Sequence, residues 1–266
     1  MQGRVLIVAG SDSGGGAGIQ ADIKTVTALG GFAMTAVTAL TAQNTQGVFG
    51  VVGIDPAFIR QQMDVVLEDI GADAVKTGML HDARVIEAVA EVLEPRAGGL
   101  PVVVDPVMVA QSGDPLLADD ALETLKRRLI PLSDLLTPNR PEAERLSGLT
   151  IATVDDMARA GRNLLDQGAR AVLIKGGHME GETLTDVLVW ADGEERFESP
   201  RIATRHLHGT GCTLASAIAT GLAQGLGLQE AVERARAYLQ AAIKSAPGFG
   251  RGSGPINHGH TVRRDG

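Results

Sequence analysis

The residues best suited to chemistry follow a short glycine turn late in the chain. Gly209-Thr210-Gly211 leads into Cys212 and a run of small residues that favours a helix. The first N–H groups of a helix have no partner within it, and the helix dipole favours an anion there. The turn therefore predicts an anion site, most simply for a phosphate, with the Cys212 thiol beside it. The alternative is a glycine turn before a core helix, with Cys212 as a small buried apolar residue.

Further polar side chains stand where the expected strands end. In an open parallel sheet, ligands bind beyond the carboxyl ends of the strands. We therefore expect these side chains to share one site with the glycine turn. They are Gln43, Asp105, Asn139, Glu142 and Lys175.

The strands and helices that must position these residues alternate along the chain, which predicts one α/β domain over residues 1–266. The expected architecture is three-layer αβα around a central, mostly parallel sheet. The glycine-rich tail is expected to loop, with His258 and His260 in a mobile segment. Strands are predicted at residues 4–9, 32–41, 48–54, 72–77, 101–105, 134–137 and 170–174, with a hairpin over residues 184–199. Helices are predicted at residues 19–29, 82–93, 118–129, 153–165, 210–223 and 229–245, with another starting at Asp55-Pro56.

The first predicted strand runs into a second glycine-rich loop, residues 10–18. Residues 16–21 formally match the dinucleotide-binding fingerprint. The next strand, however, ends at Ala42-Gln43-Asn44, with no acidic residue to bind a ribose. A loop that closes over a small ligand is therefore favoured over a dinucleotide site.

Composition excludes several other classes of protein. The formal charge of −8 argues against a nucleic-acid or anionic-membrane partner. The single cysteine cannot form an internal disulfide, which favours a reducing, cytoplasmic setting. No apolar stretch approaches the ~20 residues that span a bilayer. The sequence also lacks the P-loop, His-Glu-x-x-His, Cys-x-x-Cys and Gly-x-Ser-x-Gly motifs.

Several motifs, in this order, resemble the hydroxymethylpyrimidine/phosphomethylpyrimidine kinases of thiamine biosynthesis, in the ribokinase superfamily. They lie at residues 9–22, 41–44, 105–108, 137–142, 175–178, 208–214 and 254–258. The resemblance implies a ribokinase-like, ATP- and Mg²⁺-dependent kinase of 4-amino-5-hydroxymethyl-2-methylpyrimidine and then of its monophosphate, and a homodimer. A pyridoxal, pyridoxine or pyridoxamine kinase is the alternative within the superfamily. A non-catalytic phosphate- or nucleotide-binding regulator is the alternative from another class.

The resemblance assigns the chemistry of phosphoryl transfer to the late glycine turn. Gly209, Thr210 and Gly211 would form the hole that stabilises charge on the transferring group. Cys212 stands where most ribokinase relatives carry an aspartate base. A helix N-terminus can lower a thiol pKa toward neutrality, so Cys212 would take the hydroxymethyl proton.

The substrate would lie against the strand ends and the first glycine loop, where Gly10 belongs to the substrate site. The Gln43 amide offers a donor and an acceptor that complement the ring nitrogen and amino group of an aminopyrimidine. Met79 and Val107 would pack on the ring faces, or be ordinary core residues. By resemblance Asp22 helps to hold the substrate; the alternative is a solvated charge on a helix face.

The remaining polar residues would bind the nucleotide and its metal. Asp105 and Glu142 are the candidates to hold Mg²⁺ through water molecules, because Mg²⁺ uses few carboxylates. The alternative for Glu142 is an acidic residue that the helix dipole favours in the first turn, with no role in binding. Asn139 would orient the phosphates or metal-bound waters, and Lys175 would place a point charge on the phosphates unless it reaches solvent. Three histidines near the site are expected to be structural or to support the residues that contact the ligands: His178, His206 and His208.

Overall fold

One mixed sheet forms the centre of the molecule. The computed structural model describes residues 2–96, 98–110, 113–114, 116–118, 121–179 and 181–262. Its strands are β1 (Arg4–Asp12), β2 (Phe32–Asn44), β3 (Gly47–Gly53), β4 (Ala74–Thr77), β5 (Val102–Val104), β6 (Leu135–Leu136), β7 (Ala171–Ile174), β8 (Thr183–Trp190) and β9 (Gly193–Pro200). They are ordered β3-β2-β1-β4-β5-β6-β7-β8-β9. The strands from β2 to β7 in that order run parallel, while β3, β8 and β9 pair antiparallel to their neighbours.

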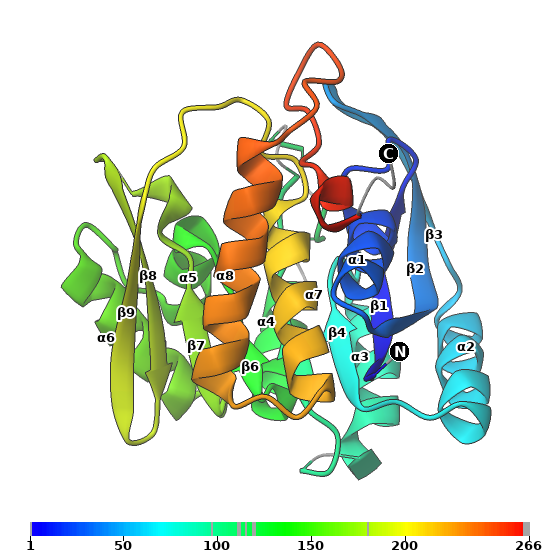
Figure 1. Cartoon of the computed structure of the whole chain (residues 1–266). Helices are drawn as coiled ribbons and strands as arrows, with labels where there is room; N and C mark the ends of the chain where they lie inside the picture. Colours follow the sequence, from blue (N-terminus) through cyan, green and yellow to red (C-terminus); the bar gives the residue numbers. More distant parts are fainter. Residues whose placement is uncertain are drawn as a thin grey trace.

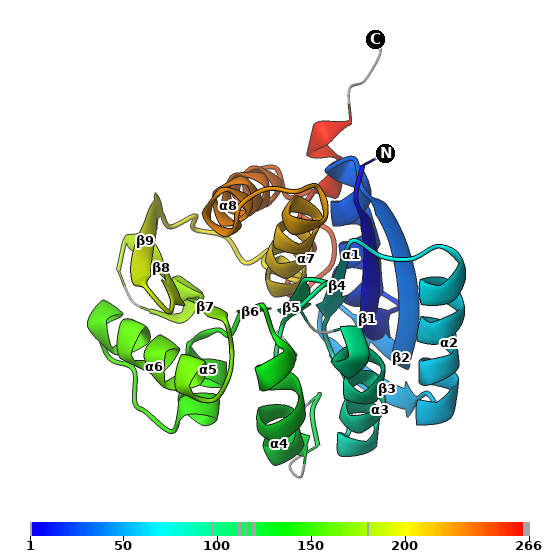
Figure 2. The ribbon, with the colours of Figure 1, turned by 90° about the horizontal axis from the view of Figure 1, so that it is seen from below.

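Helices cover both faces of this sheet, as Figures 1 and 2 show. One face carries α1 (Gly18–Ala28), α7 (Thr210–Ala223) and α8 (Leu228–Lys244). The other carries α2 (Pro56–Asp69), α3 (Ala83–Leu93), α4 (Ala121–Thr124, continued by a π-helical Leu125–Leu129), α5 (Arg140–Ser147) and α6 (Val154–Asp166). Alternate residues along the strands point to opposite faces of the sheet and belong to two separate apolar cores, one under each helical layer. The predicted three-layer architecture is confirmed.

Local signals fix several of these elements. Asp55 caps α2, accepting a hydrogen bond of 2.8 Å from the Ala57 amide, and Pro56 occupies the first helical position. The expected hairpin closes between Trp190 and Gly193. Among the helices within the described ranges, none combines the length and apolar character needed to cross a bilayer.

The C-terminal segment is packed, so the expectation that His258 lies in a mobile tail is wrong. His258 is 8% exposed. Its Nδ1 lies 3.3 Å from the Thr25 hydroxyl and 3.2 Å from the Tyr238 hydroxyl. Pro255 pairs with His208, just before α7. The tail therefore docks beside the late glycine turn.

Candidate active site

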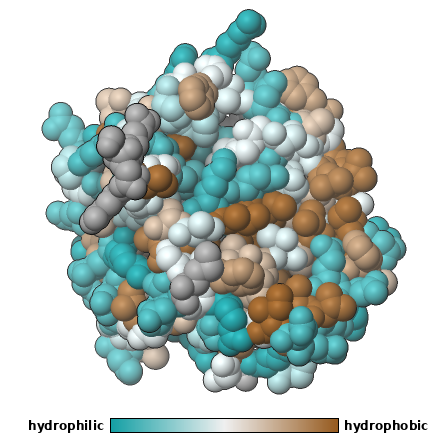
Figure 3. Space-filling model, turned by 45° about the vertical axis from the view of Figure 1, so that its right-hand side comes forward, coloured by the Kyte–Doolittle hydropathy of each residue, from teal (hydrophilic) through white to brown (hydrophobic). Residues whose placement is uncertain are grey.

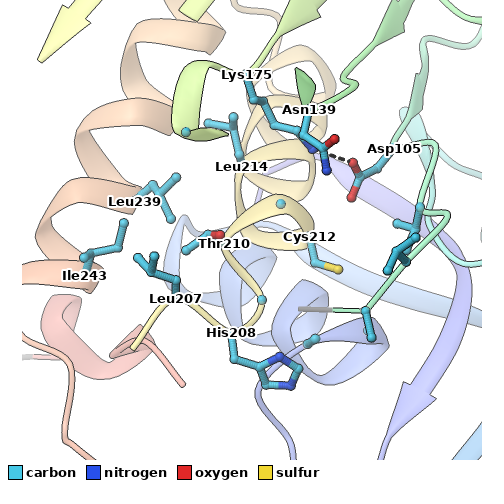
Figure 4. A pocket seen from close by; sticks show the side chains of 18 of the residues that line it. Asp105, Asn139, Lys175, Leu207, His208, Thr210, Cys212, Leu214, Leu239 and Ile243 are labelled. Atoms are coloured by element: carbon cyan, nitrogen blue, oxygen red, sulfur yellow. Dashed lines mark hydrogen bonds and ion pairs between the residues drawn. The ribbon is translucent and has the colours of Figure 1, made fainter. Parts of the chain in front are cut away.

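A cavity of about 420 Å³ opens where the parallel strands end. Its lining comes from the first glycine loop, the ends of β2, β4, β5 and β7, and the starts of α5 and α7; α8 closes one end. Figure 4 shows the part around α7. Of the predicted site residues, those that line the cavity are Gly10, Gln43, Met79, Asp105, Val107, Asn139, Glu142, Lys175, Gly209, Thr210, Gly211 and Cys212.

The late glycine turn presents free donors to this cavity. Gly209 caps α7 with a φ of 84°, and a side chain there would overlap the Gly16 carbonyl oxygen. The Thr213 amide bonds to the Gly209 carbonyl at 2.9 Å. The amides of Gly211 and Cys212 have no partner among the residues that the structure describes. These two donors have the geometry expected of an anion hole.

Lys175 brings a positive charge to the same wall. Its Nζ lies 2.9 Å from an Asp105 carboxylate oxygen and 4.0 Å from a Glu142 oxygen. A Cβ on Gly211 would lie 3.3 Å from this Nζ and 3.6 Å from Asp105, so the turn runs close beside both charged groups. Burial acts to lower the pKa of Lys175, but the two carboxylates raise it overall and keep the ammonium charged. The alternative that Lys175 reaches solvent is excluded, because its side chain is only 14% exposed.

Glu142 and Asn139 cap α5 reciprocally. The backbone amide of Asn139 donates to the Glu142 carboxylate at 2.7 Å, and the backbone amide of Glu142 donates to the Asn139 side-chain oxygen at 3.0 Å. Burial raises the pKa of Glu142 to about 7, against the effect of Lys175. Glu142 therefore changes charge near neutral pH while its helix cap sets its position.

Asp105 and Glu142 offer only two carboxylates to a metal. Within the described residues, no group of three or more His, Cys, Asp or Glu side chains is placed to hold an ion. Two carboxylates beside an open cavity suit Mg²⁺, which keeps several waters and takes its other ligands from phosphates. This donor set fits a metal that arrives with a nucleotide.

The expectation that the helix N-terminus lowers the pKa of Cys212 is wrong for this cavity without ligands. Burial raises the pKa of the Cys212 thiol to about 12. The charge on Lys76 and the backbone amide of Gly18 act in the opposite direction but are outweighed. Cys212 is half-buried and lines the cavity, so a substrate can reach the thiol.

The opposite wall holds the residues expected to contact a ring. The Thr41 hydroxyl lies 3.0 Å from the Ser11 carbonyl oxygen and 3.1 Å from the Gln43 side-chain oxygen, which ties the end of β2 to the first glycine loop beside the Gln43 amide. A Cβ on Gly10 would lie 3.0 Å from the Met79 sulfur, so glycine lets Met79 pack against the loop. Val107 lines the same space.

Asp22 lies outside this lining, contrary to the expectation of a substrate contact. Its side chain is 0% exposed, which also excludes a solvated helix charge. Both carboxylate oxygens lie 3.0 Å from Lys76 Nζ, and the Ser216 hydroxyl donates to one of them at 2.6 Å. Lys76 lies in the short, buried strand β4, and no pattern in the sequence indicated an ion pair with a helix.

Asp12 organises the first glycine loop, a role that was not predicted from the sequence. Its carboxylate accepts hydrogen bonds from the amides of Gly14, Gly16 and Ala17 at 2.7, 2.9 and 2.8 Å. The same carboxylate lies 2.8 Å from His208 Nε2. An aspartate ahead of successive glycines is the local signal for such a loop. Asp12 therefore joins the two glycine turns.

The far end of the cavity is apolar, and none of its residues was predicted to line a site. Its walls come from the turn before α7, from α7 itself and from α8, whose apolar face resembles that of a core helix in sequence (Figure 4). An apolar slot of this kind suits a flat ring. The residues are Leu207, Leu214, Leu239 and Ile243.

Comparison with known proteins agrees with this geometry. A thiamine biosynthesis bifunctional protein, ThiED, of Geobacter sulfurreducens is 54% identical over 257 residues, 97% of this chain. The alignment covers 52% of that protein, so the chain spans about half of its length. A hydroxymethylpyrimidine/phosphomethylpyrimidine kinase of Bacillus subtilis is 48% identical over 256 residues, 96% of this chain and 94% of that protein.

Solved structures give the fold. An ADP complex of a Bacillus subtilis pyridoxal kinase superposes with a TM-score of 0.89 and 37% identity, covering 98% of both chains. The fold is therefore ribokinase-like. The family model for phosphomethylpyrimidine kinase matches residues 12–257. The chain belongs to the phosphomethylpyrimidine kinase family.

Proposed function

We propose that this chain is an ATP-dependent kinase that phosphorylates 4-amino-5-hydroxymethyl-2-methylpyrimidine and then its monophosphate. One observation carries the proposal: the free amides of Gly211 and Cys212, the Lys175 ammonium and the Gln43 side-chain amide share one cavity. The cavity thus holds donors for a phosphoryl group together with Gln43, whose amide can bind an aminopyrimidine. Family membership supports the same reaction.

The transfer begins with the hydroxymethyl oxygen beside Cys212 and the nucleotide phosphates beside Lys175. A bond forms between that oxygen and the γ-phosphorus, while the bond from phosphorus to the bridging oxygen breaks and leaves its electron pair on ADP. The amides of Gly211 and Cys212 stabilise charge on the transferring group. The hydroxyl proton passes to the Cys212 thiolate as an S–H bond forms. Because thiolate is scarce at neutral pH, positioning dominates the rate, as loose phosphoryl transfer allows.

The pyrimidine ring would lie between the strand ends and the first glycine loop. The Gln43 amide would donate to the ring nitrogen and accept from the amino group. Met79 and Val107 would pack on the ring faces, and Gly10 leaves room for Met79. The same contacts would hold the monophosphate for the second transfer.

The nucleotide would fill the rest of the cavity. Adenine suits the apolar slot between α7 and α8, and the phosphates would then reach Lys175 and the side-chain NH₂ group of Asn139. Asp105 and Glu142 would hold Mg²⁺ through water molecules, and the bound ion would neutralise phosphate charge.

We further propose a cytoplasmic homodimer. Exposed apolar side chains gather on β2, β3 and α2, the side of the molecule that Figure 3 brings forward, and patches of this kind commonly mark interfaces. Sedimentation equilibrium should give twice the chain mass, and a monomer at micromolar concentration would refute the dimer. The side chains are Leu40, Phe49, Val52, Phe58 and Val65.

An assay coupled to ADP release tests the proposed reaction against its alternatives. We expect kcat/KM for the hydroxymethylpyrimidine to exceed that for pyridoxal at least tenfold, and the monophosphate to be a substrate. The 37% identity with a pyridoxal kinase makes vitamin B6 turnover the second candidate. A preference for pyridoxal would establish that alternative, and turnover of neither ring would favour a nucleotide-binding regulator.

A further inference from the structure

A lysine is buried completely within the described part of the molecule. Lys76, on β4, is 0% exposed, and its Nζ lies 3.0 Å from each oxygen of Asp22. Ser216 donates to the same carboxylate. Burying an ion pair costs free energy that apolar residues of similar size would not. Because the pair does not increase stability over apolar residues, its position suggests a role in function.

The pair lies one helical turn from Cys212. Asp22 follows Gly18 by four residues on α1, and Ser216 follows Cys212 by four residues on α7, so each pair shares a helix face. The two helices pack side by side (Figure 1). The contact between Asp22 and Ser216 consequently places the ion pair directly behind the first turn of α7.

We propose that Lys76 is a positioning residue for the proton transfer, whose fixed charge stabilises the thiolate of Cys212. Asp22 and Ser216 hold the ammonium in place, and Lys76 itself does not line the cavity. The inference rests on the role proposed above for Cys212.

The electrostatics of the thiol support this role. The charged groups around it are Lys76, Asp22, Asp105 and Lys175. Burial acts to raise the pKa of Cys212, and Lys76 is the strongest influence that lowers it. Burial also acts to lower the pKa of Lys76, but Asp22 and its other anionic neighbours raise it overall, so Lys76 stays charged. In an interior of low polarity such a charge acts strongly on a nearby thiol.

The single cysteine of the chain gives a direct test. The rate of alkylation by iodoacetamide, followed against pH, reports the thiolate of Cys212 alone. The double variant Lys76→Met/Asp22→Asn removes both charges and leaves no lone ion. Asp22 acts on the thiol in the opposite direction but less strongly than Lys76, so we expect the alkylation rate of this variant at pH 9 to fall, with kcat lowered and KM for the pyrimidine unchanged.

A matched control removes an ion pair remote from the cavity. Arg4 and Asp73 pair at 2.6 Å near the start of β1, and Arg4→Met/Asp73→Asn should leave the alkylation profile unchanged. If the first double variant does not fold, Lys76→Gln keeps a donor to Asp22 and should show at least the same fall. An unchanged profile in either folded Lys76 variant would overturn the inference. Alkylation needs no kinase substrate. It therefore tests the effect of Lys76 on the thiol independently of the ADP-release assay, which tests the proposed reaction.

Discussion

Replacing Asp12 by asparagine should destabilise the protein, because one carboxylate holds the first glycine loop. Asn keeps the oxygen that accepts from Gly14 but places an NH₂ group against the amides of Gly16 and Ala17. Each stranded donor costs about 1–3 kcal/mol, so the free energy of unfolding should fall by about 2–6 kcal/mol. His208 can change tautomer to accept from the new amide and is left out of this sum.

Urea denaturation at neutral pH measures this loss directly. Asp73→Asn is the matched control, because Asp73 pairs with the exposed Arg4 and should lose less than about 1 kcal/mol. Kinase activity of Asp12→Asn should fall as well, since the loop packs against the Gly209 turn. A loss no greater than that of the control would refute the role given to Asp12.

The pH dependence gives a second, independent check. Burial acts to raise the pKa of Asp12, but the hydrogen bonds from His208 and the loop amides lower it overall. A carboxyl with a lowered pKa in the folded state contributes stability above its unfolded pKa of about 3.9. That contribution is lost as the pH falls through the folded value. The stability difference between wild type and Asp12→Asn should therefore shrink below about pH 4, and a difference that grows would contradict the argument.

Three further variants test the site itself. Cys212→Ala should lower kcat while ATP affinity stays within twofold, and unchanged turnover would remove the thiol from the mechanism. Gln43→Leu should raise KM for the pyrimidine at least tenfold with kcat less affected, because it loses both contacts to the ring edge; an unchanged KM would exclude that contact. With a pKa of about 7, Glu142 gains a proton as the pH falls from about 8 to 6, so Mg-ATP affinity should fall over that range. Glu142→Gln should abolish this dependence, and calorimetric titration that finds it intact would assign it elsewhere.

The fold and the polar residues where the parallel strands end could be predicted because both depend on local patterns. Parallel strands end at one edge of a sheet, so residues that follow them, such as Gln43, Asp105 and Lys175, meet without knowledge of the packing. Glycine spacing before Cys212 likewise predicted the start of α7.

The features that could not be predicted depend on packing between distant segments. Lys76 and Asp22 are 54 residues apart, and only the contact of β4 with α1 makes them an ion pair. The direction of the Cys212 pKa shift follows from burial, which no local pattern shows. The composition of the tail suggested a mobile loop, whereas His258 packs between Thr25 and Tyr238.

The most direct test of the account follows the amide resonances of ¹⁵N-labelled protein as a non-hydrolysable ATP analogue and the pyrimidine are added together. The account predicts that the amide protons of Gly211 and Cys212 move downfield, because they then donate to an anion at the start of α7. The matching signal of Thr213, already bonded to Gly209, should move little. If the analogue binds while the Gly211 and Cys212 signals stay in place, the phosphoryl group is not held at this turn and the central claim is contradicted.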